Sequence, residues 1–141
     1  MQYLDLPAKK ALAEQVLRVQ PNKMTPSEMD LAMALLLRRD VQLAGGRIGE
    51  TPLVQKEGQW APFTPMSNWA DMGEVLANVA LVTGSHQLYE NDDDPEEVTG
   101  HWYSCHGYFS GVKTDGFELP AVIGETAAKL LQHHVLYSWV R

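Results

Sequence analysis

The chain opens with two segments whose apolar residues recur at helical spacing. In residues 7–19 they lie three and four positions apart, on one face of a predicted helix: Ala8, Ala11, Leu12, Val16 and Val19. In residues 25–39 the apolar stripe is wider, and it consists of Met29, Leu31, Ala32, Leu35, Leu36 and Leu37. A stripe this wide predicts a second helix that is buried on more than one side.

The second helix has a sharp start signal in the sequence Thr-Pro-Ser-Glu of residues 25–28. This is the pattern of a capping box, in which the Thr25 hydroxyl accepts from the amide of Glu28 and the Glu28 carboxylate accepts from the amide of Thr25. The proline suits the first helical position, where no amide hydrogen is needed. Arg38 and Arg39 are expected in the last turn, where positive charge favours the helix dipole.

Two further helices are predicted in the second half of the chain. One covers residues 69–79 and begins after a polar cap at Ser67 or Asn68. Its apolar face would consist of Trp69, Met72, Leu76 and Val79. The other covers residues 120–138 or 126–138, with its alanine, leucine and valine residues towards the core.

Runs of β-forming residues lie between the helices. The strongest strand candidate is residues 101–110, which is rich in aromatic residues. Shorter candidates lie at 51–54, 81–83 and 87–89, whereas residues 59–65 contain too many prolines for a central strand. The acidic residues that follow Tyr89 would connect a hairpin, and the glycine-flanked segment after the strongest strand is expected to be a turn.

The order of these elements predicts an α+β fold. We expect one domain over residues 1–141, since the sequence shows neither an internal repeat nor a linker. A small antiparallel sheet of three or four strands would pack with about four helices in a sandwich-like arrangement. Residues 101–110 would form its central strand or lie next to the centre.

Charge is concentrated in the predicted hairpin connection. The chain carries a formal net charge of −7, and six of its acids lie between residues 90 and 97: Glu90, Asp92, Asp93, Asp94, Glu96 and Glu97. Removing these six charges from −7 leaves −1, so the rest of the chain is nearly neutral. Negative charge disfavours non-specific binding to nucleic acid or to an anionic membrane surface. We therefore expect no direct nucleic-acid partner.

The sequence also predicts the cellular compartment. It has one cysteine, no basic segment followed by an apolar run at its start, and no apolar stretch long enough to span a membrane. One thiol cannot form an internal disulfide. We expect a cytoplasmic protein without a signal peptide or membrane partner.

Sequence motifs for nucleotide binding and hydrolysis are absent. There is no Gly-x-Gly-x-x-Gly, no phosphate loop ending in Gly-Lys-Ser/Thr, and no Gly-x-Ser-x-Gly. Cys105 and His106 are adjacent, but neighbours on a strand point to opposite faces and cannot form a catalytic pair. We expect no catalytic residue among them and a packed, structural role for Cys105.

Metal and cofactor sites are also not expected. His101 and Cys105 would lie about 13 Å apart on a strand, too far for one tetrahedral ion. The pair His133 and His134 lacks the four-residue spacing of zinc ligands on a helix. The acidic segment lacks the glycine of a calcium loop and contains Pro95.

Several segments, taken in order, resemble the phage ABA-sandwich domains, which include the NinX-like phage accessory proteins. The resemblance rests on residues 31–38, on the Pro-Met-Ser-Asn-Trp-Ala segment within 64–73, on His-Trp-Tyr at 101–103, and on Thr-Ala-Ala at 126–128. It implies a helix–sheet–helix sandwich in a protein encoded by a phage or prophage and located in the bacterial cytoplasm. It supplies no catalytic residues.

The leading functional hypothesis is a non-enzymatic module that binds a host or phage protein with a basic surface, in one version to inhibit a host defence system. The residues expected to contact the partner are Glu90, Asp92, Asp93, Asp94, Glu96, Glu97 and Trp60, the tryptophan expected to be partly exposed. The alternative is a small enzyme or small-molecule-binding protein that uses His86, His101, His106, Asp71 and Tyr108. A structural role in a virion or an oligomer is a third hypothesis, and the oligomeric state is left open.

Overall fold

The computed structural model describes residues 6–43, 45–79, 81–89, 98–107 and 111–137. Within these residues the chain forms four α-helices, one short 3₁₀ helix and two three-stranded antiparallel sheets. The predicted α+β class is therefore confirmed, with two small sheets where one was expected. Among the described residues, no helix combines the length and apolar character needed to cross a membrane.

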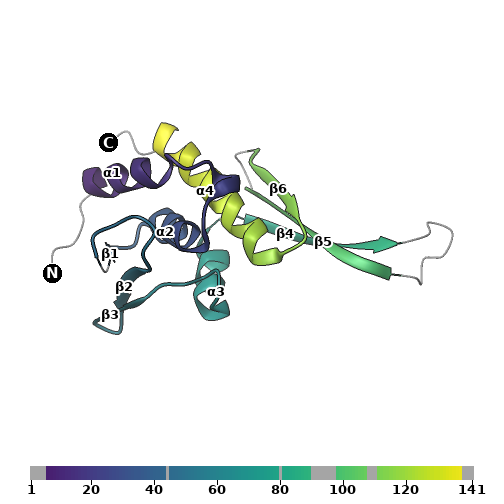
Figure 1. The fold of residues 1–141 in the computed structure, drawn as a ribbon, viewed down its shortest axis with the longest axis horizontal. Coiled ribbons are helices and arrows are strands. Elements are labelled where there is room, and N and C mark those ends of the chain that lie inside the picture. Colours follow the sequence, from purple (N-terminus) through teal and green to yellow (C-terminus); the bar gives the residue numbers. More distant parts are fainter. Residues whose placement is uncertain (1–5, 44, 80, 90–97, 108–110, 138–141) are drawn as a thin grey trace.

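Helical segments and groups of three strands alternate along the chain (Figure 1). The helical segments are α1 (Leu6–Val16), η1 (Pro21–Lys23), α2 (Pro26–Leu36), α3 (Trp69–Asn78) and α4 (Leu119–Tyr137). The strands of the first sheet are β1 (Val41–Leu43), β2 (Pro52–Lys56) and β3 (Gln59–Pro62). Those of the second sheet are β4 (Leu81–Tyr89), β5 (Val98–Gly107) and β6 (Lys113–Gly116).

Helix α2 is the centre of the hydrophobic core. All nine residues from Glu28 to Leu36 are buried, as the wide apolar stripe predicted. The capping box is confirmed: the Glu28 amide donates to the Thr25 hydroxyl over 3.3 Å, and the Thr25 amide donates to the Glu28 carboxylate over 2.9 Å. The helix ends at Leu36, so the expectation that Arg38 and Arg39 lie in its last turn was wrong. Arg38 has a φ of +58°, a left-handed conformation that ends the helix.

Helix α4 packs against α2, and α1 packs against both. Gly124 permits the close approach at this contact. A Cβ atom there would lie 2.7 Å from Met29 Sδ and 2.8 Å from Met66 Sδ, closer than such atoms approach in proteins. The two helices and the loop that carries Met66 therefore meet at a position where a larger residue would require the Met29 and Met66 side chains to move.

The first sheet lies beside α2, with β2 in the middle. The proline-rich segment supplies the edge strand β3, which agrees with its exclusion from a central position. Arg39 attaches this sheet to α3, because its guanidinium pairs with Glu74 and donates to the Gln55 carbonyl. The short strand β1 had no sequence signal of its own.

The second sheet has β5 at its centre, as predicted. Strand β4 is continuous where two short strands were expected, because Gly84 pairs with Ser104 within the ladder. The expectation of a turn over residues 111–116 was wrong for β6. That segment pairs with β5, and the Lys129 ammonium of α4 donates to the Lys113 carbonyl over 2.8 Å.

Helix α4 covers one face of the second sheet. The buried Thr126 hydroxyl donates to the Val122 carbonyl over 2.8 Å and lies 3.3 Å from the Cys105 carbonyl. The Cys105 side chain is buried, which confirms its packed role, and burial raises the pKa of its thiol. His106 is exposed, as expected for a neighbour on the opposite face.

Helix α3 buries a narrower face than predicted. The Asn68 side chain caps it by accepting from the amides of Ala70 and Asp71. Met72 and Val75 are buried, but Trp69 is 59% exposed, so its expected place on the buried face was wrong. Trp69 is the first residue of the helix, and a residue in the first turn can fit the periodic pattern with no element packed over it.

Candidate functional site

The second sheet extends into a two-stranded projection. Strand β6 pairs with β5 only from Tyr103 to His106. Beyond this point residues 98–102 of β5 pair with residues 86–89 of β4 alone, and we call these two segments the arm. Figure 1 shows the arm extending away from the helices. Its strands are joined by residues 90–97, so the predicted hairpin is confirmed on either side of that connection.

The root of the arm carries an aromatic stack. The imidazole of His86 lies on the indole of Trp102, with 3.9 Å between ring centroids and 16° between the planes. His86 Nε2 is 3.1 Å from Ser104 Oγ. These side chains lie on the face opposite Cys105, because residues of one strand alternate between faces. The stack therefore lies on the face of the sheet that is turned away from α4.

The residues predicted to contact a partner fall into two groups. Glu90, Asp92, Asp93, Asp94, Glu96 and Glu97 lie outside the described residues, between the ends of the two strands of the arm. Trp60 lies in β3, where it is partly exposed as predicted and has interactions of its own. Strand β3 and the arm lie on opposite sides of the helices (Figure 1), so they do not form one surface.

The residues named for a small-molecule or catalytic site are not brought into one pocket. His86 and His106 are exposed on the second sheet. Asp71 is buried in α3, where it accepts from the Lys56 ammonium over 2.7 Å and from the Thr64 amide over 2.9 Å. The His101 side chain and Tyr108 lie outside the described residues. Asp71 therefore holds α3 and the preceding loop against the first sheet.

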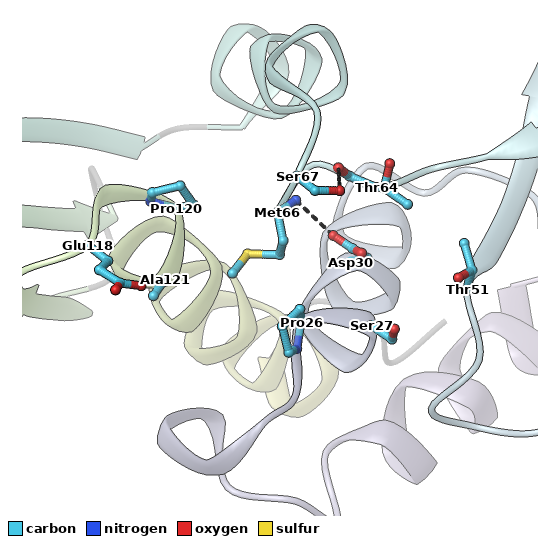
Figure 2. Close-up of a pocket in the computed structure, with 10 residues that line it drawn as sticks. All are labelled: Pro26, Ser27, Asp30, Thr51, Thr64, Met66, Ser67, Glu118, Pro120 and Ala121. Atoms are coloured by element: carbon cyan, nitrogen blue, oxygen red, sulfur yellow. Dashed lines mark hydrogen bonds between the residues drawn. The ribbon is translucent and has the colours of Figure 1, made fainter.

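The structure shows a different pocket, lined by both polar and apolar residues, which sequence reasoning missed. Its volume is about 430 Å³, and it lies between the N-terminal ends of α2 and α4 and the loop that connects β3 to α3 (Figure 2). Its lining consists of Pro26, Ser27, Asp30, Thr51, Thr64, Met66, Ser67, Glu118, Pro120 and Ala121. Such a volume lies within the range of small-ligand sites, roughly 300–1,000 Å³.

Asp30 is the most deeply buried acid of this pocket. Its residue is 4% exposed, and its Oδ1 accepts from the Met66 amide over 2.9 Å. Burial raises the pKa of the carboxyl group to about 6, against the lowering effect of the Met66 hydrogen bond, and the negative charge of Asp71 raises it further. The sequence contains a signal for this site, since Asp30 interrupts the apolar stripe between Met29 and Leu31.

Metal-binding clusters are not present in the described part of the chain, where no three His, Cys, Asp or Glu side chains are grouped to hold an ion. The chain matches no protein-family model, and comparison with the curated proteins finds no relative.

Proposed function

We propose that this protein is a non-enzymatic binding module that docks on a protein partner through the arm and the acidic residues 90–97. The observation that supports the proposal is the projection of the arm beyond β6 and the helices (Figure 1). Two-stranded hairpins that lack a third strand or a helix are only marginally stable in water. Such an arm would contribute little to the stability of the fold. Binding to another molecule would account for its presence.

Charge supports a partner with a basic surface. No Lys or Arg occurs between Lys56 and Lys113, so both strands of the arm and their connection lack positive side chains. The six acids of residues 90–97 are thus not balanced by cations nearby in the sequence. Concentrated negative charge in the segment that joins the two strands of the arm accelerates encounter with a positive surface and makes association sensitive to salt.

The edge of the sheet offers a second element of recognition. Strand β4 is an edge strand of the second sheet, and its outer edge has no further strand among the described residues. Its backbone groups can pair with an extended segment of the partner, as in other complexes formed by strand addition. The aromatic stack of His86 and Trp102 lies on the adjoining open face.

The resemblance to phage accessory proteins extends the proposal to the partner. On this basis the partner is a protein of the bacterial host or of the phage, and inhibition of a host defence protein is one such role. This part of the proposal rests on the sequence resemblance alone.

The experiment compares two variants that each remove two negative charges. One carries Asp92→Asn and Asp93→Asn in the connection, and the control carries Glu14→Gln and Glu57→Gln at exposed positions of the helices and the first sheet. Capture from host lysate and mass spectrometry identify the partner, and association rates are then measured with the purified partner at several salt concentrations.

The connection variant is expected to associate more slowly than wild type and to depend less on salt, whereas the control keeps both properties. The full replacement of Asp92, Asp93, Asp94, Glu96 and Glu97 by Ser or Asn should deepen the effect. If association is indifferent to these changes and to salt, the acidic connection is only a solvated loop. Light scattering of the free protein tests the competing structural role, which requires a stable oligomer.

A further inference from the structure

The pocket beside Asp30 is lined by acids and hydroxyl groups but by no base. Its two charged residues are Asp30, at its inner wall, and Glu118, at its exposed rim. Figure 2 shows them on opposite sides of the Met66 side chain. Ser27, Thr51, Thr64 and Ser67 add hydroxyl oxygens, and no Lys, Arg or His contributes to the lining. Electrostatic complementarity therefore favours a positively charged occupant.

Helix N-termini usually favour anions, but the two that border this pocket are poor anion sites. Proline occupies position 26, the first residue of α2, and position 120, the second residue of α4. Prolines supply no amide hydrogen. The Glu28 amide is already bonded to the Thr25 hydroxyl. These N-terminal turns thus offer few donors to an anion, while Asp30 would repel one.

Asp30 lacks a cationic partner within the described residues. The ion pairs there involve other acids, and the neighbouring Asp71 is paired with Lys56. One carboxylate oxygen of Asp30 is bonded to the Met66 amide. A buried carboxylate that adjoins a cavity and has no positive neighbour is costly to ionise, which agrees with its raised pKa. A cation in the cavity would remove that cost.

The lining selects an ammonium ion over a guanidinium ion. Guanidinium groups prefer a planar pair with both oxygens of a carboxylate, and the Met66 amide already takes one of the acceptor positions of Oδ1 and competes with such a pair. An ammonium group is compact, and its three donors can be shared between one carboxylate oxygen and nearby hydroxyls. Met66, Pro26, Pro120 and Ala121 also line the pocket and give apolar surface suited to methylene groups.

We propose that this pocket binds the ammonium group of a small aliphatic amine, with Asp30 as its carboxylate partner and the chain of methylenes against Met66. Glu118 at the rim would hold a second ammonium group, so a short diamine fits better than a monoamine. The site is separate from the arm, and amine binding here does not depend on whether the arm binds a protein.

The test is calorimetric titration of the full chain with n-butylammonium, butane-1,4-diammonium and butyrate. Both amines are expected to bind saturably, with a dissociation constant of about 1 mM for the monoamine and a tighter one for the diamine. Butyrate should not bind. Absence of saturable amine binding at about ten times that concentration would overturn the proposal.

Variants assign the binding to this pocket. Asp30→Asn keeps an oxygen that can accept from the Met66 amide, so the fold should persist while amine binding weakens at least about tenfold. Ala121→Leu fills the pocket without changing its charge and should have a similar effect. Glu118→Gln should weaken only the diamine. Binding that survives in both Asp30→Asn and Ala121→Leu, with folding verified by circular dichroism, refutes the site.

A lysine side chain of another protein carries the same ammonium group. A short peptide with one central lysine is therefore titrated beside n-butylammonium. Tighter binding of the peptide assigns the pocket to a protein side chain, and tighter binding of the free amine assigns it to a small metabolite. Both results require the same loss in Asp30→Asn, and a peptide or amine that binds that variant equally well contradicts the proposal.

Discussion

Helix α2 and the arm differ in what surrounds them. Nine consecutive residues of α2 are buried, and α1, α4 and the first sheet pack around it. Along residues 98–102 each strand of the arm has the other as its only strand neighbour in the described structure. Regions with dense apolar contacts contribute most to the free energy of unfolding, while sparsely packed segments open locally at a low free-energy cost. The comparison predicts that stability and partner binding can be altered separately.

The largest effect is expected in α2. Leu35 is fully buried, and Leu35→Ala should lower the free energy of unfolding by about 3 kcal/mol through lost contacts and a residual cavity. Urea denaturation measures the change. Leu136→Ala is the matched control, because Leu136 is 63% exposed and its truncation should cost less than about 0.5 kcal/mol. Equal effects of the two substitutions would contradict the central place of α2 in the core.

The second effect depends on pH and again belongs to α2. Burial raises the pKa of Asp30 from its ordinary 3.8 to about 6, so the folded protein holds this proton more tightly than the unfolded chain. Its contribution to stability is complete below pH 4 and is lost as the pH rises through 6. Asp30→Asn should therefore stabilise the protein at pH 7, on the order of 2 kcal/mol.

The gain from Asp30→Asn should vanish near pH 4, which urea titrations at several pH values can follow. Glu118→Gln provides the control, because that exposed acid should leave the pH dependence unchanged. A variant that is no more stable than wild type at pH 7 would show that Asp30 is adequately solvated in the pocket.

A smaller effect is expected at the start of α2. Thr25→Ala removes the acceptor of the Glu28 amide and should cost about 1 kcal/mol. Glu28→Gln should cost less, because glutamine can still accept from the Thr25 amide. Thermal and urea denaturation report both changes. A Thr25→Ala variant as stable as wild type would mean that water replaces the cap at no cost.

The smallest effect on unfolding is expected in the arm. Trp102→Ala removes the stack with His86 and should change the free energy of unfolding by about 0.5 kcal/mol, in the range of a single cross-strand pair. Hydrogen exchange should accelerate within residues 86–89 and remain unchanged in α2. Accelerated exchange in α2 as well would show that the arm and the helices unfold together, and the comparison would fail.

Local signals in the sequence predicted much of this fold. The capping box and apolar spacing of α2 act within a few residues, and β5 is marked by its aromatic content, so both were identified correctly. Strands β1 and β6 were missed because three or four residues become a strand only through a partner elsewhere, such as Lys113 opposite His106. The same limit explains why one sheet was expected.

Prediction of the candidate sites was limited even more by contacts between residues that are distant in the sequence. The acidic connection was identified because its charges are consecutive, but its residues lie outside the described structure. The Asp30 pocket is assembled from α2, α4 and two loops, and its acids, Asp30 and Glu118, are 88 positions apart in the numbering. The one local sequence signal for the pocket was Asp30, an acid within an apolar stripe. Charge patterns in sequence therefore locate loops, whereas pockets depend on packing.

The rate at which the Cys105 thiol is labelled reports how often the sheet opens at the junction between the arm and the helices. This thiol is the only one in the chain, it is buried in the part of β5 that pairs with β6, and burial raises its pKa. A disulfide reagent attacks the thiolate, so it reacts at this position only during transient opening of the sheet. A partner that binds the arm without changing the opening of the sheet at Cys105 would leave the labelling rate unchanged. A partner whose binding also stabilises β5 at Cys105 would lower the labelling rate.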